Sequence, residues 1–535
     1  MPDAPPPAIP STTAGIRAAA LLLAASTLLS RILGYGRDWL IGFEFGATGQ
    51  TDVYQASFAV PDLLNHLLAG GALSVSLLPR MAELYARQDR GEGEPGEADR
   101  AFSVVCSAMM VAAAVLVGVA WLSADLLVAI WFPGFDASKQ SHTAQLTRIV
   151  LPAQLFFLVG GLFQAALLAR QRFKAMALTP LLYNAGILIG GVVGGRVGQI
   201  EGFSWGALAG ACAGGLLVPV WSARHTLRFH FAFAPKDPEI RRFLWIAAPL
   251  MIGVSLTTVD EWLVKYFGSS LQAGAISWLM TARRVMLVPI GILGSAAGQA
   301  TGSYLARLHA EGRRDELAQT LTRSVAAVTA LSLVAAGLLW ALALPVVAFL
   351  FQYGKFTAGD AARTAEALRP LAWAIPAWGA QQVLARAFYA TGDTWRPMAT
   401  TTVVLVAAIP LYAVAGNAGQ HALVGLCLAG TVGMWLQAAG LVLLARRRFG
   451  FDLTDFGRQL LRAALACAAG ATCAWALSQA GGVSIWATWP APLRRGFDLA
   501  IAGAPAALAA VLVAAAIGMP GVPARLTRKL RMTRA

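Results

Sequence analysis

The sequence predicts an all-α polytopic membrane protein, and three features of the chain indicate this class. First, 57% of the 535 residues are hydrophobic and only 13% are charged, whereas about 25% of a soluble domain is charged. Second, apolar runs recur from Ala18 to Gly518, each near the length of about 20 residues that crosses a bilayer. Third, Lys and Arg concentrate in alternate loops, as in a multi-pass topology.

The apolar runs predict about fourteen transmembrane helices. These expected spans lie near 16–43, 52–86, 101–132, 143–170, 175–195, 203–224, 241–267, 270–307, 322–351, 362–390, 396–415, 420–445, 458–479 and 496–518. Residues 1–15 are expected to form a disordered cytoplasmic tail, and residues 519–535 a basic cytoplasmic tail.

The loops after even-numbered spans carry most of the basic residues, and by the positive-inside rule this bias places both termini in the cytoplasm. Arg494 and Arg495 are the exception, because they follow an odd-numbered span. The net charge of +15 comes from these loops. It does not indicate nucleic-acid binding, since no basic segment is interleaved with aromatic residues.

No cofactor, metal site or enzymatic site is expected. The five cysteines form no CxxC pair, and the six histidines show no spacing typical of metal ligands. The phosphate-binding motif GxxxxGK[ST] is also absent. The residues that remain to be explained are therefore the charged groups inside the apolar spans.

The chain resembles itself at an offset of about 220 residues, a spacing typical of an internally duplicated transporter. The end of span three, at Phe132 to Gly134, resembles the end of span nine, at Phe351 to Gly354. Because an even number of spans separates the halves, the repeats are parallel. This predicts two six-helix lobes, 16–227 and 241–447, joined by a cytoplasmic linker at 228–240, around a central cavity. Two extra helices at 458–518 lie outside the repeat.

Span one carries Arg31, Arg37 and Asp38, with Gly34 and Gly36 between them. A charge at the centre of a bilayer costs several kcal/mol, about 3 on insertion scales, and such residues usually face a cavity. Arg31 and Asp38 project on one helix face, and the glycines permit a bend. In the alternative reading, Arg37 and Asp38 reach a nearby membrane interface.

Span two carries Asp52, Asp62, Asn65 and His66, and Pro61 is expected to break its helix. Asp62 and His66 are four residues apart and therefore share a face. These residues are candidates for substrate binding. The alternative is a histidine that is hydrogen-bonded to a carboxylate within a packed bundle.

Spans seven and eight carry five further charges. Glu261 and Lys265 have the spacing of a helical ion pair. Asp260 and Glu261 are candidates for a coupling ion, and Asp260 would alternatively partner an arginine. Arg283 and Arg284 require partners, because two unpaired guanidinium groups in lipid are very costly. At least one of them is expected to face the cavity, and both are candidates for substrate binding.

These four spans are the first pair of each repeat, where such transporters place their binding site. Arginine dominates the cationic residues there, and a guanidinium group matches the geometry of a phosphate and stays charged at all relevant pH values. The expected substrate is therefore anionic, with a phosphate or pyrophosphate group.

Several motifs occur in order along nearly the whole chain. They are Ser30-Arg31-x-x-Gly34-x-x-Arg37-Asp38, Phe45-Gly46, Thr51-Asp52, Ala59-Val60-Pro61, Gly71-Ala72-Leu73-Ser74, Leu78-Pro79, Ser277-Trp278-Leu279, Ala282-x-Arg284, Val288-Pro289-x-Gly291-x-Leu293-Gly294, Leu350-Phe351-Gln352-Tyr353-Gly354-Lys355-Phe356 and Tyr389-Ala390-x-Gly392-Asp393-Thr394. Together they resemble the motifs of the lipid II flippases (MurJ, also called MviN).

The resemblance implies the fold of the multidrug/oligosaccharidyl-lipid/polysaccharide (MOP) exporters, with two six-helix lobes in a V and an extra helix pair that forms a groove for the lipid tail. It implies that a cationic cavity receives the pyrophosphate-sugar headgroup of lipid II, and that alternating access is coupled to membrane potential, Na+ or H+. Arg31, Arg37, Asp38, Asp52 and Arg284 match functional positions of the family.

The chain departs from the family pattern at four positions. Asp62 replaces an Asn, Asn65 replaces an Arg, Gly70 replaces a Glu, and Arg283 stands where the family usually has an Asp. One basic group has thus moved from span two to span eight, which leaves the identity of the saccharide open.

The expected function is transport of lipid II across the bacterial inner membrane. The protein is expected to be a monomer. Two alternatives on the same fold are a flippase for another polyprenyl-linked saccharide, of exopolysaccharide or O-antigen type, and a cation-coupled drug exporter. The exporter would need an acidic, aromatic cavity. A membrane-embedded glycosyltransferase would need acidic metal-binding motifs, which are absent from the sequence.

Overall fold

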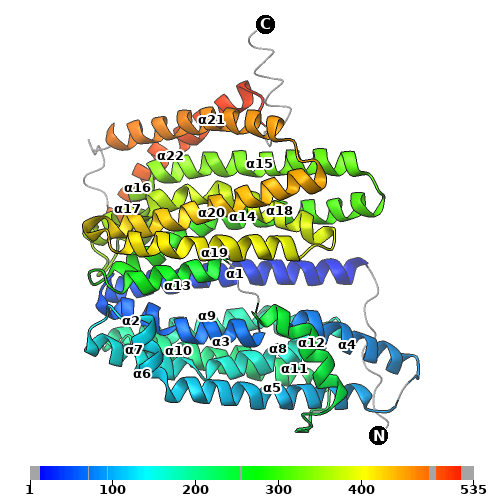
Figure 1. The fold of residues 1–535 in the computed structure, drawn as a ribbon. Coiled ribbons are helices and arrows are strands. Elements are labelled where there is room, and N and C mark those ends of the chain that lie inside the picture. Colours follow the sequence, from blue (N-terminus) through cyan, green and yellow to red (C-terminus); the bar gives the residue numbers. More distant parts are fainter. Residues whose placement is uncertain (1–12, 70–71, 93, 253–255, 481–489, 520–535) are drawn as a thin grey trace. The chain divides into compact units, whose positions relative to one another are not determined.

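The computed structural model describes residues 13–69, 72–92, 94–252, 256–480 and 490–519, and its regular structure is helical throughout these ranges (Figure 1). The chain divides into two compact units, which comprise Met1–Phe45 with Gly49–Val254, and Gly46–Thr48 with Ser255–Ala535. The expected tails at 1–15 and 519–535 lie almost entirely outside the described residues.

The first unit contains thirteen described helical elements. They are α1 (Thr13–Phe45), α2 (Gly49–Ser57), α3 (Ala59–Ala69), α4 (Ala72–Asp89), α5 (Glu97–Leu122), α6 (Ala124–Trp131), α7 (Ala137–Val150), α8 (Ala153–Ala169), α9 (Lys174–Arg196), α10 (Glu201–Gly210), the π-helix η1 (Ala211–Leu217), α11 (Val218–Ala223) and α12 (Pro238–Ile252).

The second unit begins within the seventh expected span. Its helices are α13 (Leu256–Gly268), α14 (Ala275–Ala310), α15 (Arg314–Ala341), α16 (Ala343–Phe351), α17 (Ala358–Ala372), α18 (Ala374–Ala390), α19 (Trp395–Gly416), the short 3-10 helix η2 (Gly419–His421), α20 (Ala422–Phe449), α21 (Leu453–Ala480) and α22 (Ala491–Ala516). The expected division into lobes at 227 and 241 remains a prediction.

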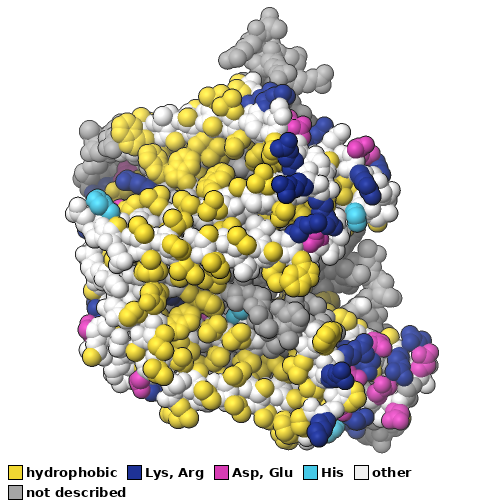
Figure 2. Space-filling view, in the orientation of Figure 1, with side chains coloured by type: hydrophobic (Ala, Val, Ile, Leu, Met, Phe, Trp, Pro, Cys, Tyr) yellow, Lys and Arg dark blue, Asp and Glu magenta, His cyan; other side chains and the backbone are white. Residues whose placement is uncertain are grey.

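Ten helices of the described chain are long and apolar enough to cross a membrane. They correspond to the expected spans other than one, two, seven and ten. The described residues of those four are also helical, but span one carries four charges, and spans two and ten are each divided into shorter helices at Phe58 and Trp373. Figure 2 shows hydrophobic side chains along the helix flanks of each unit and Lys and Arg gathered near helix ends. The chain is thus a polytopic membrane protein, and the count of fourteen remains a prediction.

The predicted internal repeat is visible in the order of helices and helix breaks. In the first unit, α5 and α6 have 26 and 8 residues and are followed by α7 and α8 with 14 and 17 residues. In the second unit, α15 and α16 have 28 and 9 residues and are followed by α17 and α18 with 15 and 17 residues. The same four-helix pattern therefore occurs once in each unit.

Side chains from neighbouring helices satisfy backbone carbonyls at the helix breaks, where the intrahelical ladder is interrupted. At the break between α17 and α18, Thr431 Oγ1 donates to the Pro370 carbonyl at 2.9 Å, and Trp435 Nε1 donates to the Trp373 carbonyl at 2.8 Å. Such partners are needed because lipid offers none. The breaks are therefore held by tertiary contacts.

Glycine allows α9 and α10 to pack with their backbones in direct contact. A Cβ atom on Gly186 would lie 2.6 Å from the Gly210 Cα atom, and one on Gly190 or Gly206 would collide with a carbonyl oxygen of the facing helix. Small residues at this spacing are the usual means of close helix packing in membranes, where van der Waals contact replaces the hydrophobic effect.

The extra C-terminal helices pack on the second unit. Buried residues of α21 and α22, including Ala466 and Ala514, form a cluster with Ala330 of α15. Near the start of α22, Arg495 donates a hydrogen bond to the Gln352 carbonyl, and its guanidinium lies 5.2 Å from the Tyr353 ring centroid. Arg495, one of the two arginines that depart from the loop-charge pattern, therefore links α22 to the end of α16.

We predict that Gly190→Ala lowers the midpoint of thermal unfolding of the purified protein in detergent, because the added methyl group forces α9 and α10 apart. Overpacking of this kind costs about 1–3 kcal/mol. The control is Gly118→Ala, where the added Cβ meets nothing within 4 Å and the better helix former leaves stability equal or higher. Equal midpoints for the two variants would contradict the close packing.

Candidate functional site

The charged motif of span one lies on a single uninterrupted helix, α1. Arg31 is exposed, Arg37 is half-buried and Asp38 is buried. Arg37 and Asp38 form an ion pair with 2.9 Å between Nε and Oδ1, so the two adjacent charges neutralise each other locally. Gly34 and Gly36 were expected to permit a bend, and α1 is continuous through both residues.

The segment of α1 that holds these charges is fixed to α9. Asn184 Nδ2 donates to the Ser30 hydroxyl at 3.1 Å and to the Pro180 carbonyl at 3.0 Å. Gly34 lies one turn further along α1, and a Cβ atom on Gly34 would lie 3.9 Å from Asn184 Oδ1. Asn184 was not among the predicted site residues. A polar amide in an otherwise apolar span was the signal that could have identified it.

Span two is interrupted before the proline that was expected to break it. α2 ends at Ser57 and α3 begins at Ala59, so Pro61 lies in the first turn of α3, where a missing N–H costs little. The Ser57 carbonyl accepts a hydrogen bond from Thr147 Oγ1 at 3.2 Å. The break is therefore held open by a partner from α7.

The predicted residues of span two have different environments. Asp52 is buried on α2, with 3% of its surface exposed. On α3, Asp62 and Asn65 are exposed and His66 is half-buried. Gly70, which was expected to depart from the family pattern, lies outside the described residues. The first unit thus brings Arg37 and Asp38 into contact, while Arg31, Asp62 and Asn65 present polar groups at its surface.

In the second unit, Asp260 and Arg283 form a buried ion pair. The Arg283 guanidinium on α14 donates through Nη1 to one oxygen of the Asp260 carboxylate on α13, and 7% of each side chain is exposed. The partner that the sequence required for Arg283 is therefore Asp260.

Two residues that were not predicted complete this ion pair. The Tyr412 hydroxyl on α19 donates to the second oxygen of Asp260. Gly430 on α20 leaves room for both groups, since a Cβ there would lie 2.7 Å from Asp260 Oδ1 and 2.8 Å from the Tyr412 hydroxyl. Neither residue has a local sequence signal, because each acts only through its position opposite another helix.

The second predicted pair on α13 is also formed. Lys265 Nζ lies 2.8 Å from Glu261 Oε1, with 3% and 38% of the side chains exposed. Arg284 is half-buried on α14, within electrostatic range of Glu261. Arg283 and Arg284, although adjacent, therefore face different carboxylates.

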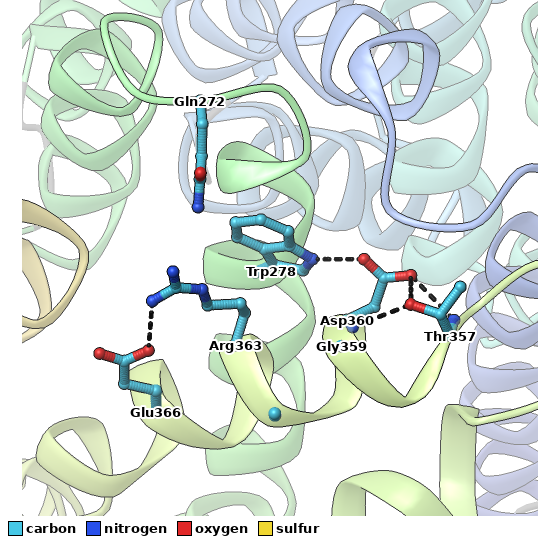
Figure 3. A pocket seen from close by; sticks show the side chains of 8 residues that line it. Gln272, Trp278, Thr357, Gly359, Asp360, Arg363 and Glu366 are labelled. Atoms are coloured by element: carbon cyan, nitrogen blue, oxygen red, sulfur yellow. Dashed lines mark hydrogen bonds and ion pairs between the residues drawn. The ribbon is translucent and has the colours of Figure 1, made fainter. Parts of the chain in front are cut away.

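A separate polar cleft of about 540 Å³ opens at the start of α17 (Figure 3). Trp278 Nε1 donates to Asp360 Oδ1 at 3.0 Å, and the Thr357 amide donates to Asp360 Oδ2 at 2.8 Å. Arg363 and Glu366 form an ion pair of 2.9 Å along its edge. The polar groups that line this cleft are thus largely engaged with one another.

Charged side chains among the described residues form ion pairs within each unit. No group of three or more His, Cys, Asp or Glu residues that could hold a metal ion occurs within the described ranges. All five cysteines are free thiols, as expected for small packing residues.

Comparison with solved structures defines the class of the protein. A structure of the lipid II flippase MurJ in an inward closed conformation superposes with a TM-score of 0.75 at 18% identity, covering 92% of this chain and 98% of that one. An inward-facing multidrug resistance MATE family transporter of the MOP superfamily gives a TM-score of 0.64 at 15% identity, covering 78% and 94%. The chain therefore has the fold that these two solved proteins share.

Sequence comparison then defines the family. The family model described as lipid II flippase MurJ matches residues 43–489, and the chain therefore belongs to the MurJ family of lipid II flippases. It is a transporter rather than an enzyme. The lipid II flippase MurJ of Burkholderia cenocepacia is 28% identical over 403 residues, which cover 72% of this chain and 76% of that protein. A "probable lipid II flippase MurJ" of Bdellovibrio bacteriovorus is 27% identical over 451 residues, covering 84% and 85%.

We predict that Tyr412→Phe destabilises the protein, because it removes a donor from a buried carboxylate and keeps the ring. Hydrogen bonds to charged groups contribute about 1.5–3 kcal/mol, so the midpoint of thermal unfolding should fall by several degrees. The control is Tyr389→Phe, since Tyr389 is 50% exposed. If both variants have the same midpoint of thermal unfolding as the wild-type protein, the Tyr412 hydroxyl does not stabilise the Asp260 carboxylate.

Proposed function

We propose that this chain moves lipid II across the bacterial inner membrane by alternating access, and that Arg31, Arg37 and Arg284 bind the pyrophosphate of its headgroup. Arg31 is the observation that supports this most directly. It is an exposed guanidinium within the helix α1, where Ile32 beside it is 57% exposed. A charge at such a position needs water or an anion beside it, because hydrocarbon does not solvate it.

The charge states of the other arginines fit the same role. Arg37 is paired with Asp38 at 2.9 Å, so binding of a pyrophosphate would exchange one anionic partner for another. A guanidinium group can make this exchange without losing its charge, since its pKa exceeds about 12. In this proposal Asp38 and Asp52 orient the arginines, and Asp62, Asn65 and His66 contact the headgroup.

The mode of energy coupling is part of the same proposal. Transport is linked to membrane potential, Na+ or H+, and both termini are cytoplasmic, in accord with the loop-charge bias. The two coupling-ion candidates, Asp260 and Glu261, are ion-paired with Arg283 and Lys265. A coupling cation at either carboxylate would therefore have to displace a basic side chain. We further propose that α21 and α22 guide the lipid tail and that the protein acts as a monomer.

We predict that Arg31→Ala abolishes transport and leaves the amount of folded protein unchanged, because Arg31 is exposed and its removal opens no cavity. Transport is measured as rescue of cells depleted of their own lipid II flippase and as translocation of lipid II in proteoliposomes. Arg323→Ala is the control, since Arg323 is an exposed arginine of α15. A fully active Arg31→Ala variant would exclude Arg31 from the binding site.

The departures at Asp62, Asn65 and Arg283 favour one second candidate, a flippase for another polyprenyl-linked saccharide. Rescue of cells that lack their lipid II flippase, without rescue of cells that lack an O-antigen flippase, is the expected result. The reverse pattern would assign the substrate to the second candidate and would leave the fold and the arginine site in place.

A further inference from the structure

We propose that the Arg283 guanidinium is the resident counter-cation of Asp260, so that this carboxylate needs no diffusible cation in the transport cycle. Removing the guanidinium would turn the same position into a binding site for a small monovalent cation such as Na+. The proposal concerns the second unit alone and does not depend on which lipid is transported.

The hydrogen bonds at Asp260 engage both of its carboxylate oxygens. Arg283 donates to Oδ2, and the Tyr412 hydroxyl donates to Oδ1. The three side chains come from three helices, α14, α13 and α19, so the carboxylate is surrounded by protein donors. A cation that approached either oxygen would have to displace a donor that is already in contact.

Burial makes a positive partner obligatory. Asp260 is 5% exposed, Arg283 is 6% exposed and Tyr412 is 1% exposed. A carboxylate without a partner in such surroundings takes up a proton or another cation, because the cost of leaving it charged and alone is many kcal/mol. Breaking a buried pair on one side is strongly destabilising for the same reason.

The space beside the pair is too small for an additional hydrated cation. The adjoining cavity, lined by Asp260, Tyr412, Gly430 and Met434 among others, has a volume of about 10 Å³. A single water molecule needs about 10–15 Å³. Truncation of Arg283 would add the volume of the guanidinium to this cavity and leave the carboxylate and the hydroxyl as oxygen ligands.

The neighbouring charges do not replace Arg283. Lys265, the basic residue of α13, is 2.8 Å from Glu261, and the Cys427 thiol of α20 is within electrostatic range of both Asp260 and Arg283. Glu261, with 38% of its side chain exposed, is the carboxylate that a coupling cation reaches more readily. The charge balance at Asp260 thus rests on Arg283.

The test compares thermal unfolding of the purified full-length protein in NaCl and in choline chloride at equal ionic strength. Ligand that binds only the folded state raises the midpoint. The wild-type protein should show equal midpoints in the two salts, whereas Arg283→Gln should unfold several degrees higher in NaCl than in choline chloride. Radiolabelled sodium should bind to Arg283→Gln and not to the wild type.

Two further variants serve as controls. Asp260→Asn/Arg283→Gln removes both charges and should lose the response to Na+, and Arg323→Gln makes the same chemical change at an exposed site and should behave as the wild type. Should Arg283→Gln fold only in NaCl, the proposal would be supported.

Three results would overturn the proposal. The first is a sodium-specific rise in the wild-type midpoint that Asp260→Asn abolishes, which would make Asp260 a cation site despite Arg283. The second is a folded Arg283→Gln variant with no response to Na+. The third is failure of Arg283→Gln to fold in either salt while the double variant folds.

Discussion

The constraint on which this structure depends is that hydrocarbon offers no partner to a charge or to a free backbone carbonyl. Within each unit, several features that depart from a plain apolar helix have a partner from a neighbouring helix. Thr147 bonds to the carbonyl at the end of α2, Thr431 and Trp435 bond to carbonyls at the α17–α18 break, and Arg283 neutralises Asp260. These polar contacts require close packing, and glycine provides it at α9 with α10 and at Gly430.

The same constraint separates two kinds of arginine. Arg283 is buried and paired with Asp260, and the pair joins α13 to α14 while Tyr412 of α19 bonds to the same carboxylate. Arg31 is exposed on the helix α1, and our proposal assigns it to ligand binding. Arg283 thus serves the interior of its unit.

Much of the fold follows from local sequence. The apolar runs identified the helices, and the duplicated segments near Phe132 and Phe351 predicted the repeat that α5 to α8 and α15 to α18 display. Both signals are local, because apolar length and helix-terminating residues act within one segment of chain. The pair of Glu261 and Lys265 was predictable for the same reason, since a spacing of four residues places two side chains on one helix face.

The candidate site was predictable only in part. By itself, the sequence indicated which charges lie in the expected spans, that Arg283 needs a partner, and to which family the motifs point. Tertiary structure alone decided that Arg283 is paired with Asp260 rather than exposed, that Tyr412 and Gly430 complete the pair, and that Asn184 fixes Ser30. These choices depend on which faces of distant helices meet, and the free energy of a buried charge is set by those neighbours rather than by its own segment.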